Sequence, residues 1–172
     1  MRKVKITFII LGLLIHGLSL NSCIVSGMAK KFCSVKEGAI PPNFGKDNST
    51  LLCILSGSRG HDKYIRKHAE SHYGGEVDFA LKSEITEGKY TNPRKYRYLL
   101  DHDVSLVQHT EYSTSSNRTS SYTNKTSGYF IYDRIDRKKY DSGFTSGMYG
   151  KILKAYFKNL EKVRLQNQNI PD

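Results

Sequence analysis

The sequence predicts an α+β fold, a two-layer sandwich in which a mostly antiparallel sheet of about five or six strands has two helices packed on it. Three patterns predict this fold. Residues 50–56 form a continuous apolar run between turn residues, which is typical of a buried central strand. Residues 76–82 alternate apolar and polar side chains, as a half-exposed strand does. Residues 147–165 carry apolar side chains at intervals of three and four, which indicates an amphipathic helix.

The first half of the predicted domain has the order strand, helix, strand. Residues 57–60 contain two glycines and end the apolar run. Residues 61–73 then show helical spacing of apolar and histidine side chains, and Gly74 and Gly75 end that helix. Together with the alternating strand that follows, this segment has the size of a βαβ unit.

The second half predicts antiparallel strands before the C-terminal helix. Residues 84–93 are rich in turn formers, and residues 113–127 are mostly Ser, Thr and Asn, which predicts a long exposed loop or a hairpin tip. We expect His102 and Asp103 to form a tight turn or a bulge. The strands expected here are residues 96–101, 104–112, 128–133 and 139–144.

The N-terminus has the pattern of an export signal. Three cations within the first five residues precede an apolar run over residues 6–20, which is shorter than the roughly 20 residues of a membrane-spanning helix. The run ends in Leu20-Asn21-Ser22-Cys23, which resembles the lipobox of bacterial lipoproteins, although Asn21 departs from the usual small residue. The resemblance implies that Cys23 is lipidated and that the leader is removed.

This organisation predicts a cell-envelope location, as an outer- or inner-membrane lipoprotein that faces the periplasm or the cell surface. Attachment through several acyl chains is effectively permanent, whereas one chain alone gives marginal membrane binding. The expected segments are a signal peptide (residues 1–22), a tether and lead-in loop (23–46), a single α+β domain (47–165) and a frayed tail (166–172).

The charge balance favours anionic partners. The chain has 27 basic and 16 acidic residues, and its formal net charge is +11. We expect the membrane, reached through the N-terminal lipid, and an anionic envelope polymer or another envelope protein as partners. An exported protein is not expected to bind nucleic acid. No motif for a cofactor is present, so no cofactor is expected.

Two cysteines remain if Cys23 carries the lipid. Cys33 and Cys53 are candidates for a disulfide in an oxidising compartment. The alternative is that Cys53, which lies inside a run of leucines and isoleucine, is a small core residue.

Three histidines on the predicted first helix are the candidates for a metal site. His68 and His72 are four residues apart and share a face, and His61 lies two turns earlier on nearly the same face. The alternative is that these imidazoles border the buried stripe of the helix and bind nothing. The sequence lacks the metalloprotease pattern, because Ala69 stands where that motif has glutamate.

An anion site is the second candidate. Ser58, Arg59 and Gly60 lie between a strand and a helix start, where free amides and the helix dipole favour a bound anion. A plain helix-capping turn explains the same residues. There are two weaker candidates. The first is a binding surface of basic and aromatic residues, formed by Lys89-Tyr90 and residues 94–98, which also fits the exposed face of an edge strand. The second is an acid/base pair within Asp101-His102-Asp103.

The leading functional hypothesis is a lipid-anchored, non-catalytic binding or structural module of the cell envelope, and no catalytic residue is assigned. One alternative is an envelope hydrolase or metal-binding enzyme that uses the helix histidines. Another is a secreted eukaryotic glycoprotein, because N-x-S/T triplets occur at Asn48, Asn117 and Asn124.

Overall fold

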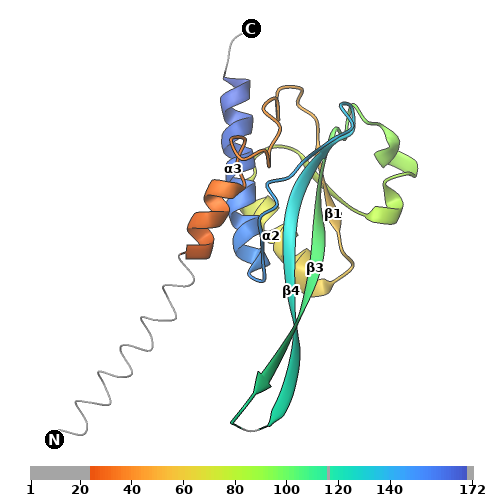
Figure 1. Cartoon of the computed structure of the whole chain (residues 1–172). Helices are drawn as coiled ribbons and strands as arrows, with labels where there is room; N and C mark the ends of the chain where they lie inside the picture. The colour runs from red at the N-terminus through yellow and green to blue at the C-terminus, as the bar shows by residue number, and fades with distance from the viewer. Residues whose placement is uncertain (1–23, 116, 170–172) are drawn as a thin grey trace, which may run out of the picture.

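The computed structural model describes residues 24–115 and 117–169, so the predicted signal peptide and Cys23 lie outside the described residues (Figure 1). Residues 24–32 are helical and are called the N-terminal helix below. The remaining elements are β1 (Leu51–Leu55), α2 (Arg59–His72), β2 (Val77–Leu81), the 3₁₀ turns η1 (Lys82–Glu84) and η2 (Gly88–Thr91), β3 (Tyr98–Ser113), β4 (Arg118–Asp133), β5 (Lys138–Tyr140), β6 (Thr145–Ser146) and α3 (Tyr149–Gln168). The predicted α+β fold is confirmed.

One mixed sheet holds all the described strands. Their order is β2-β1-β3-β4-β5, and β6 pairs with β4. The central strand β1 runs parallel to both β2 and β3, whereas every pair that involves β4 is antiparallel. β1 is buried on both faces, as its unbroken apolar sequence predicts.

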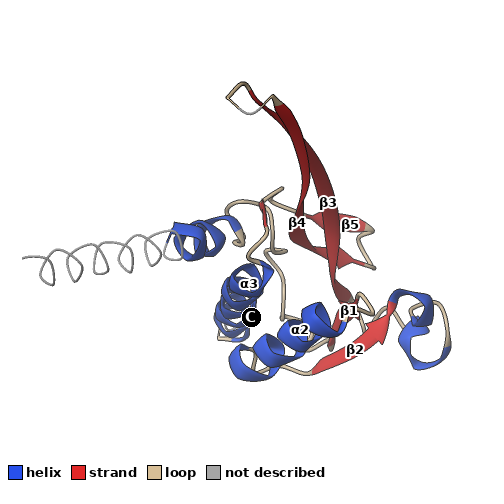
Figure 2. Cartoon of the chain, turned by 90° about the horizontal axis from the view of Figure 1, so that it is seen from below, coloured by secondary structure: helices blue, strands red, loops and turns tan. Residues whose placement is uncertain are grey.

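The helices cover one face of the sheet. Figure 2 shows α2, α3 and the N-terminal helix together on that side. Leu51 and Cys53 of β1 point into the core between sheet and helices, where they meet Ile65 of α2 and Tyr156 of α3. α2 and α3 also pack against each other. The contact is so close that a Cβ added to Gly150 of α3 would lie 3.0 Å from the Tyr64 ring of α2.

A smaller core covers the opposite face of the sheet. Leu52 and Ile54 point there and pack with Tyr96 under the segment that contains η1 and η2. Arg134 fastens this segment, because its guanidinium donates to the carbonyl oxygens of Tyr90 (2.7 Å), Thr91 (3.2 Å) and Tyr96 (3.3 Å). The central strand is therefore enclosed between helices and a folded loop.

A buried ion pair stabilises the end of the sheet opposite the hairpin tip. Asp133 is fully buried and accepts two hydrogen bonds from Arg97 Nε (2.9 and 3.1 Å) and one from Arg97 Nη2 (2.8 Å). Arg97 also donates to Asp47 (3.0 Å) and Asp136 (3.1 Å). Burial by itself would raise the pKa of Asp133, but the hydrogen bonds from Arg97 outweigh it and lower that pKa.

Residues 23–46 were expected as a tether and lead-in loop, and their described part packs on the body. Residues 24–32 form a helix, and the turns after it bring Ile40 and Phe44 into the main core, both almost fully buried. Asn159 of α3 donates to the Lys30 carbonyl at 2.9 Å. The apolar residues of this segment are separated by lysines, glycines and prolines, so no periodic pattern in the sequence indicated that they are buried.

The expected frayed tail from residue 166 also differs. α3 continues to Gln168, and Asn167 Nδ2 donates to the carbonyl oxygens of Pro42 (2.8 Å) and Phe44 (2.9 Å). The described part of the expected tail is helical to Gln168, and its Asn167 satisfies carbonyls of residues 42 and 44.

Both remaining cysteines are buried free thiols. Cys33 and Cys53 lie in the main core with 2 % and 0 % exposure, and no disulfide joins them. Cys53 therefore packs as a small core residue, which is the alternative that its apolar neighbours favoured.

β3 and β4 form one long hairpin instead of separate strands and a loop. Each has 16 residues, and they pair without interruption from Tyr98 opposite Asp133 to Ser113 opposite Arg118. His102 and Asp103 are regular strand residues, so the expected turn is absent. Figures 1 and 2 show the outer half of this hairpin extending away from the rest of the molecule.

Candidate functional site

The outer half of the hairpin is the most exposed regular structure in the described chain. We call residues 104–115 and 117–127 the arm. Large apolar side chains are exposed on it although no core accounts for them: Leu106 (67 %), Tyr112 (61 %), Val107 (47 %), Val104 (46 %) and Tyr122 (45 %). Four of these five belong to β3. Apolar side chains gathered on an exposed element mark an interaction surface more often than single scattered ones do.

Cross-strand contacts order the arm. His109 and Tyr122 face each other in the register, and their rings stack at 5.1 Å. The Tyr122 hydroxyl donates to Glu111 at 3.0 Å, and Tyr112 bonds to Asn117 next to the turn. Such pairs stabilise an antiparallel ribbon that has no core beneath it.

One edge of the arm is open along its whole length. β1 pairs with β3 only at Leu99 and Leu100, so from Asp101 to Ser113 no described strand lies on that side. The β4 edge is partly covered, because β6 pairs at Ser127 and Gly128. An open edge presents a row of unpaired N–H and C=O groups that another strand can bond.

Histidines from distant segments meet where the arm joins the body. His61 of α2 shares a hydrogen bond of 2.8 Å with the Tyr129 hydroxyl, and its ring lies 4.3 Å from that of His102. The pKa values of His61 and His102 are both lowered, chiefly by burial, which favours the neutral rings. His102 Nδ1 is buried without a hydrogen-bond partner among the described residues.

The three predicted metal ligands divide between two places. His61 is engaged with Tyr129 and His102, while His68 stacks on His72 at 5.6 Å farther along α2. Nowhere in the described ranges do three histidine, cysteine, aspartate or glutamate side chains lie close enough to hold a metal ion. A metal at His61, His68 and His72 stays a prediction that this arrangement does not support.

The start of α2 has an acidic residue of its own beside it. Asp62 in the first turn accepts from the Ser56 amide and from the Ser56 hydroxyl, both at 2.9 Å. Burial raises the pKa of Asp62, but these hydrogen bonds outweigh it, so that the carboxylate is favoured. The predicted anion site at Ser58, Arg59 and Gly60 therefore already faces an internal anion.

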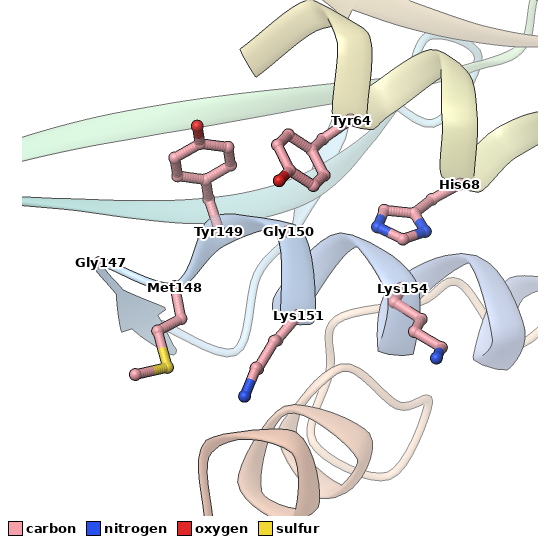
Figure 3. Close-up of a pocket in the computed structure, with 8 residues that line it drawn as sticks. All are labelled: Tyr64, His68, Gly147, Met148, Tyr149, Gly150, Lys151 and Lys154. Atoms are coloured by element: carbon pink, nitrogen blue, oxygen red, sulfur yellow. The ribbon is translucent and has the colours of Figure 1, made fainter. Parts of the chain in front are cut away.

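The start of α3 differs, and a pocket of about 440 Å³ lies beside it (Figure 3). Neither helix has a side-chain cap, although the Met148 amide before α3 donates to Ser146 Oγ at 3.1 Å; unlike α2, α3 has no acidic residue in its first turn. The first turn of α3 contacts Tyr64 of α2, and the pocket lies against both. Its lining residues are Tyr64, His68, Gly147, Met148, Tyr149, Gly150, Lys151 and Lys154.

His68 forms the inner wall of this pocket. It is 6 % exposed, and neither ring nitrogen has a hydrogen-bond partner of standard geometry among the described residues. Its pKa is lowered to about 4, first by burial and then by the positive groups of His72, Lys67 and Lys154; the nearby Gly150 backbone offsets this slightly. Sequence reasoning named His68 but missed the pocket, because the α3 start that completes it lies about 80 residues away.

The weaker candidates are engaged in structural contacts. Asp103 accepts from Lys139 Nζ at 2.7 Å, and Lys82 Nζ lies 3.4 Å from Asp101. In the basic and aromatic set, Lys89 pairs with Asp78 at 2.8 Å, and Tyr96 is buried.

The fold and these features define an α+β sheet-and-helix domain with an open-edged hairpin arm and a separate pocket. Comparison with protein-family models, with curated proteins and with solved structures gives no match for this chain. Within the described residues, no helix combines the length and apolar character that crossing a membrane requires.

Proposed function

We propose that this protein is a lipid-anchored assembly module of the cell envelope, which holds a partner protein by pairing one of the partner's strands with the open edge of β3. The single observation that carries the binding part is the unpaired edge from Asp101 to Ser113, together with the apolar side chains exposed on the same strand. Strand addition satisfies the open backbone groups, and alternate side chains then supply specificity.

The composition of the arm favours a protein over an anionic polymer as the partner. The described part of the arm carries the charged residues Glu111, Arg118 and Lys125, so its two charge signs nearly balance. Most of the cations of the chain lie on the body. Polymer binding through charge would need a basic surface, whereas strand pairing needs an open edge and apolar contacts.

The anchor rests on the lipobox ending at Cys23, which lies outside the described residues. The folded state of residues 24–46 adds a geometric consequence. Because the N-terminal helix begins directly after that position and belongs to the body, a lipid on Cys23 would hold the body at the bilayer surface. The arm would then act close to the membrane.

Labelled palmitate tests the anchor. We expect the full chain to incorporate the label in a bacterial host and Cys23→Ala to lose it. Cys33→Ala is the matched control and should keep the label, since its thiol is buried in the core. Labelling that survives in Cys23→Ala would overturn the anchor.

Photo-crosslinking in intact cells tests the binding role. A photoreactive residue replaces Leu106 on the arm or, as a control, Glu70 on the exposed side of α2. We expect position 106 alone to give a defined product, with the crosslinked peptide lying in a strand of the partner. Crosslinks at position 106 to a second copy of this chain, or none beyond those at position 70, would overturn the proposal.

A further inference from the structure

The pocket between α2 and α3 is separate from the arm, and its chemistry is that of an anion site. The first turn of α3 presents backbone amides and the positive end of the helix dipole, with no capping side chain and no acidic residue. Lys151 and Lys154 line the same pocket. Positive groups gathered at an uncapped helix start favour an anion.

A second observation points to a ligand independently of the helix terminus. His68 is more than nine-tenths buried, lines the inner wall and has no hydrogen-bond partner of standard geometry for either ring nitrogen among the described residues. Figure 3 shows its ring on the α2 side of the pocket, facing the first turns of α3. A buried polar group without a hydrogen-bond partner is destabilising, and an acceptor bound in the pocket would offset that cost.

The rest of the lining is suited to an apolar group. Tyr64 and Met148 border the pocket and are 40 % and 42 % exposed, and most of the lining surface is apolar. Tyr64 meets Tyr149 edge to face at 5.5 Å, which gives an aromatic wall. The Tyr64 ring also lies 6.0 Å from the His68 ring, so the aromatic wall continues to the imidazole.

We propose that this pocket binds a phosphate monoester with an apolar substituent: Lys154 and the α3 amides hold the phosphate, His68 donates to it, and Tyr64 and Met148 contact the substituent. Lys154 and the positive end of the α3 dipole attract a dianion more strongly than a single carboxylate, and the neutral His68 ring offers one N–H donor, which favours phosphate. Lys67 and His72 on α2 and Lys154 on α3 face His68, and a bound dianion reverses their effect on it.

The test uses the full chain in detergent, with phenyl phosphate, inorganic phosphate and phenol as probes. NMR follows the His68 ring signals and the dissociation constant. We expect phenyl phosphate to bind more tightly than either fragment and to raise the pKa of His68. Lys154→Ala should weaken binding about tenfold, as the loss of a charge-assisted contact does. Lys158→Ala is the matched control, one turn farther along α3, and should bind as the parent does.

The source of the phosphate is distinguished in nanodiscs. If the His68 pKa rises in phosphatidate nanodiscs but not in phosphatidylcholine nanodiscs, the site binds a lipid headgroup. If the rise requires added phenyl phosphate, the site binds a soluble ester. Either result supports the site. No response to any phosphate ester, or equal binding by Lys154→Ala, overturns it. The arm takes no part in this test, so its outcome is independent of the proposed function.

Discussion

Leu100 and Leu106 stand on the same strand and face the same side of the sheet, yet Leu100 is 1 % exposed and Leu106 is 67 % exposed. At Leu100 the strand is covered by β1, β4 and the helices; at Leu106 it is paired only with β4. One continuous hairpin therefore contains a half that builds the core and a half that no core requires. The difference in exposure between the two halves distinguishes residues that stabilise the fold from residues that are available to bind a partner.

The largest expected effect is at the packed end of the hairpin. Arg97→Ala leaves the fully buried Asp133 without its cation and should lower the free energy of unfolding by about 3–5 kcal/mol. Arg118→Ala removes an exposed arginine at the arm tip and should change the free energy of unfolding by less than about 0.5 kcal/mol. Urea denaturation measures both. Equal effects would contradict the division of the hairpin.

A pair of leucine substitutions sharpens the same contrast. Leu100→Ala opens a cavity in the core and should cost about 2–5 kcal/mol, whereas Leu106→Ala should stay within about 0.5 kcal/mol. Thermal unfolding followed by circular dichroism gives both values. A large loss in Leu106→Ala would show that the arm packs on the body.

Acid should destabilise the body through its buried imidazoles. His61, His68 and His102 have lowered pKa values in the folded chain, that of His68 to about 4, while an unfolded histidine titrates near about 6.5. Between these values the unfolded chain binds more protons, so stability falls as the pH drops below about 6.5. Denaturation at pH 7 and pH 5 should show this fall, and His68→Gln should reduce it. The matched control is His109→Gln on the arm, and an equal reduction there would contradict the account.

Removing most of the arm should also have a small effect on stability. Replacing residues 106–125 by Asn-Gly keeps the pair Ser105–Thr126 and the contact of β4 with β6. The free energy of unfolding should change by no more than about 1 kcal/mol, because none of the described residues in the deleted range is buried. Calorimetry measures the change in stability, and the crosslinking yield at a retained position measures partner binding. A collapse of stability would make the arm part of the fold.

Sequence patterns predicted those elements whose burial follows a regular pattern. α2, β2 and α3 each bury one face, so the spacing of their apolar residues was informative; β1 is buried on both faces, so its unbroken apolar run was informative. The outer part of β4 was expected as a loop or hairpin tip, because both of its faces are exposed and Ser and Thr do not alternate with apolar residues. Residues 24–46 were misjudged because their contacts are with α3, far along the chain.

The candidate sites depend still more on distant contacts. The α2 histidines were identified from their spacing, but the partner of His61 is Tyr129 on β4. The α2 start was chosen as an anion site for its glycines and arginine, although Asp62 already balances it. The start of α3 has no acidic residue in its first turn. This absence is visible in the sequence and could have indicated the start of α3 as the candidate anion site.

Amide hydrogen exchange on the purified complex with the crosslinked partner tests the central claim most directly. If a partner strand pairs with β3, amides at alternate positions between Asp101 and Ser113 should exchange more slowly in the complex, while the open part of β4 is unchanged. Uniform exchange along β3 in the presence and absence of the partner, or protection confined to β4 or the body, would contradict the account.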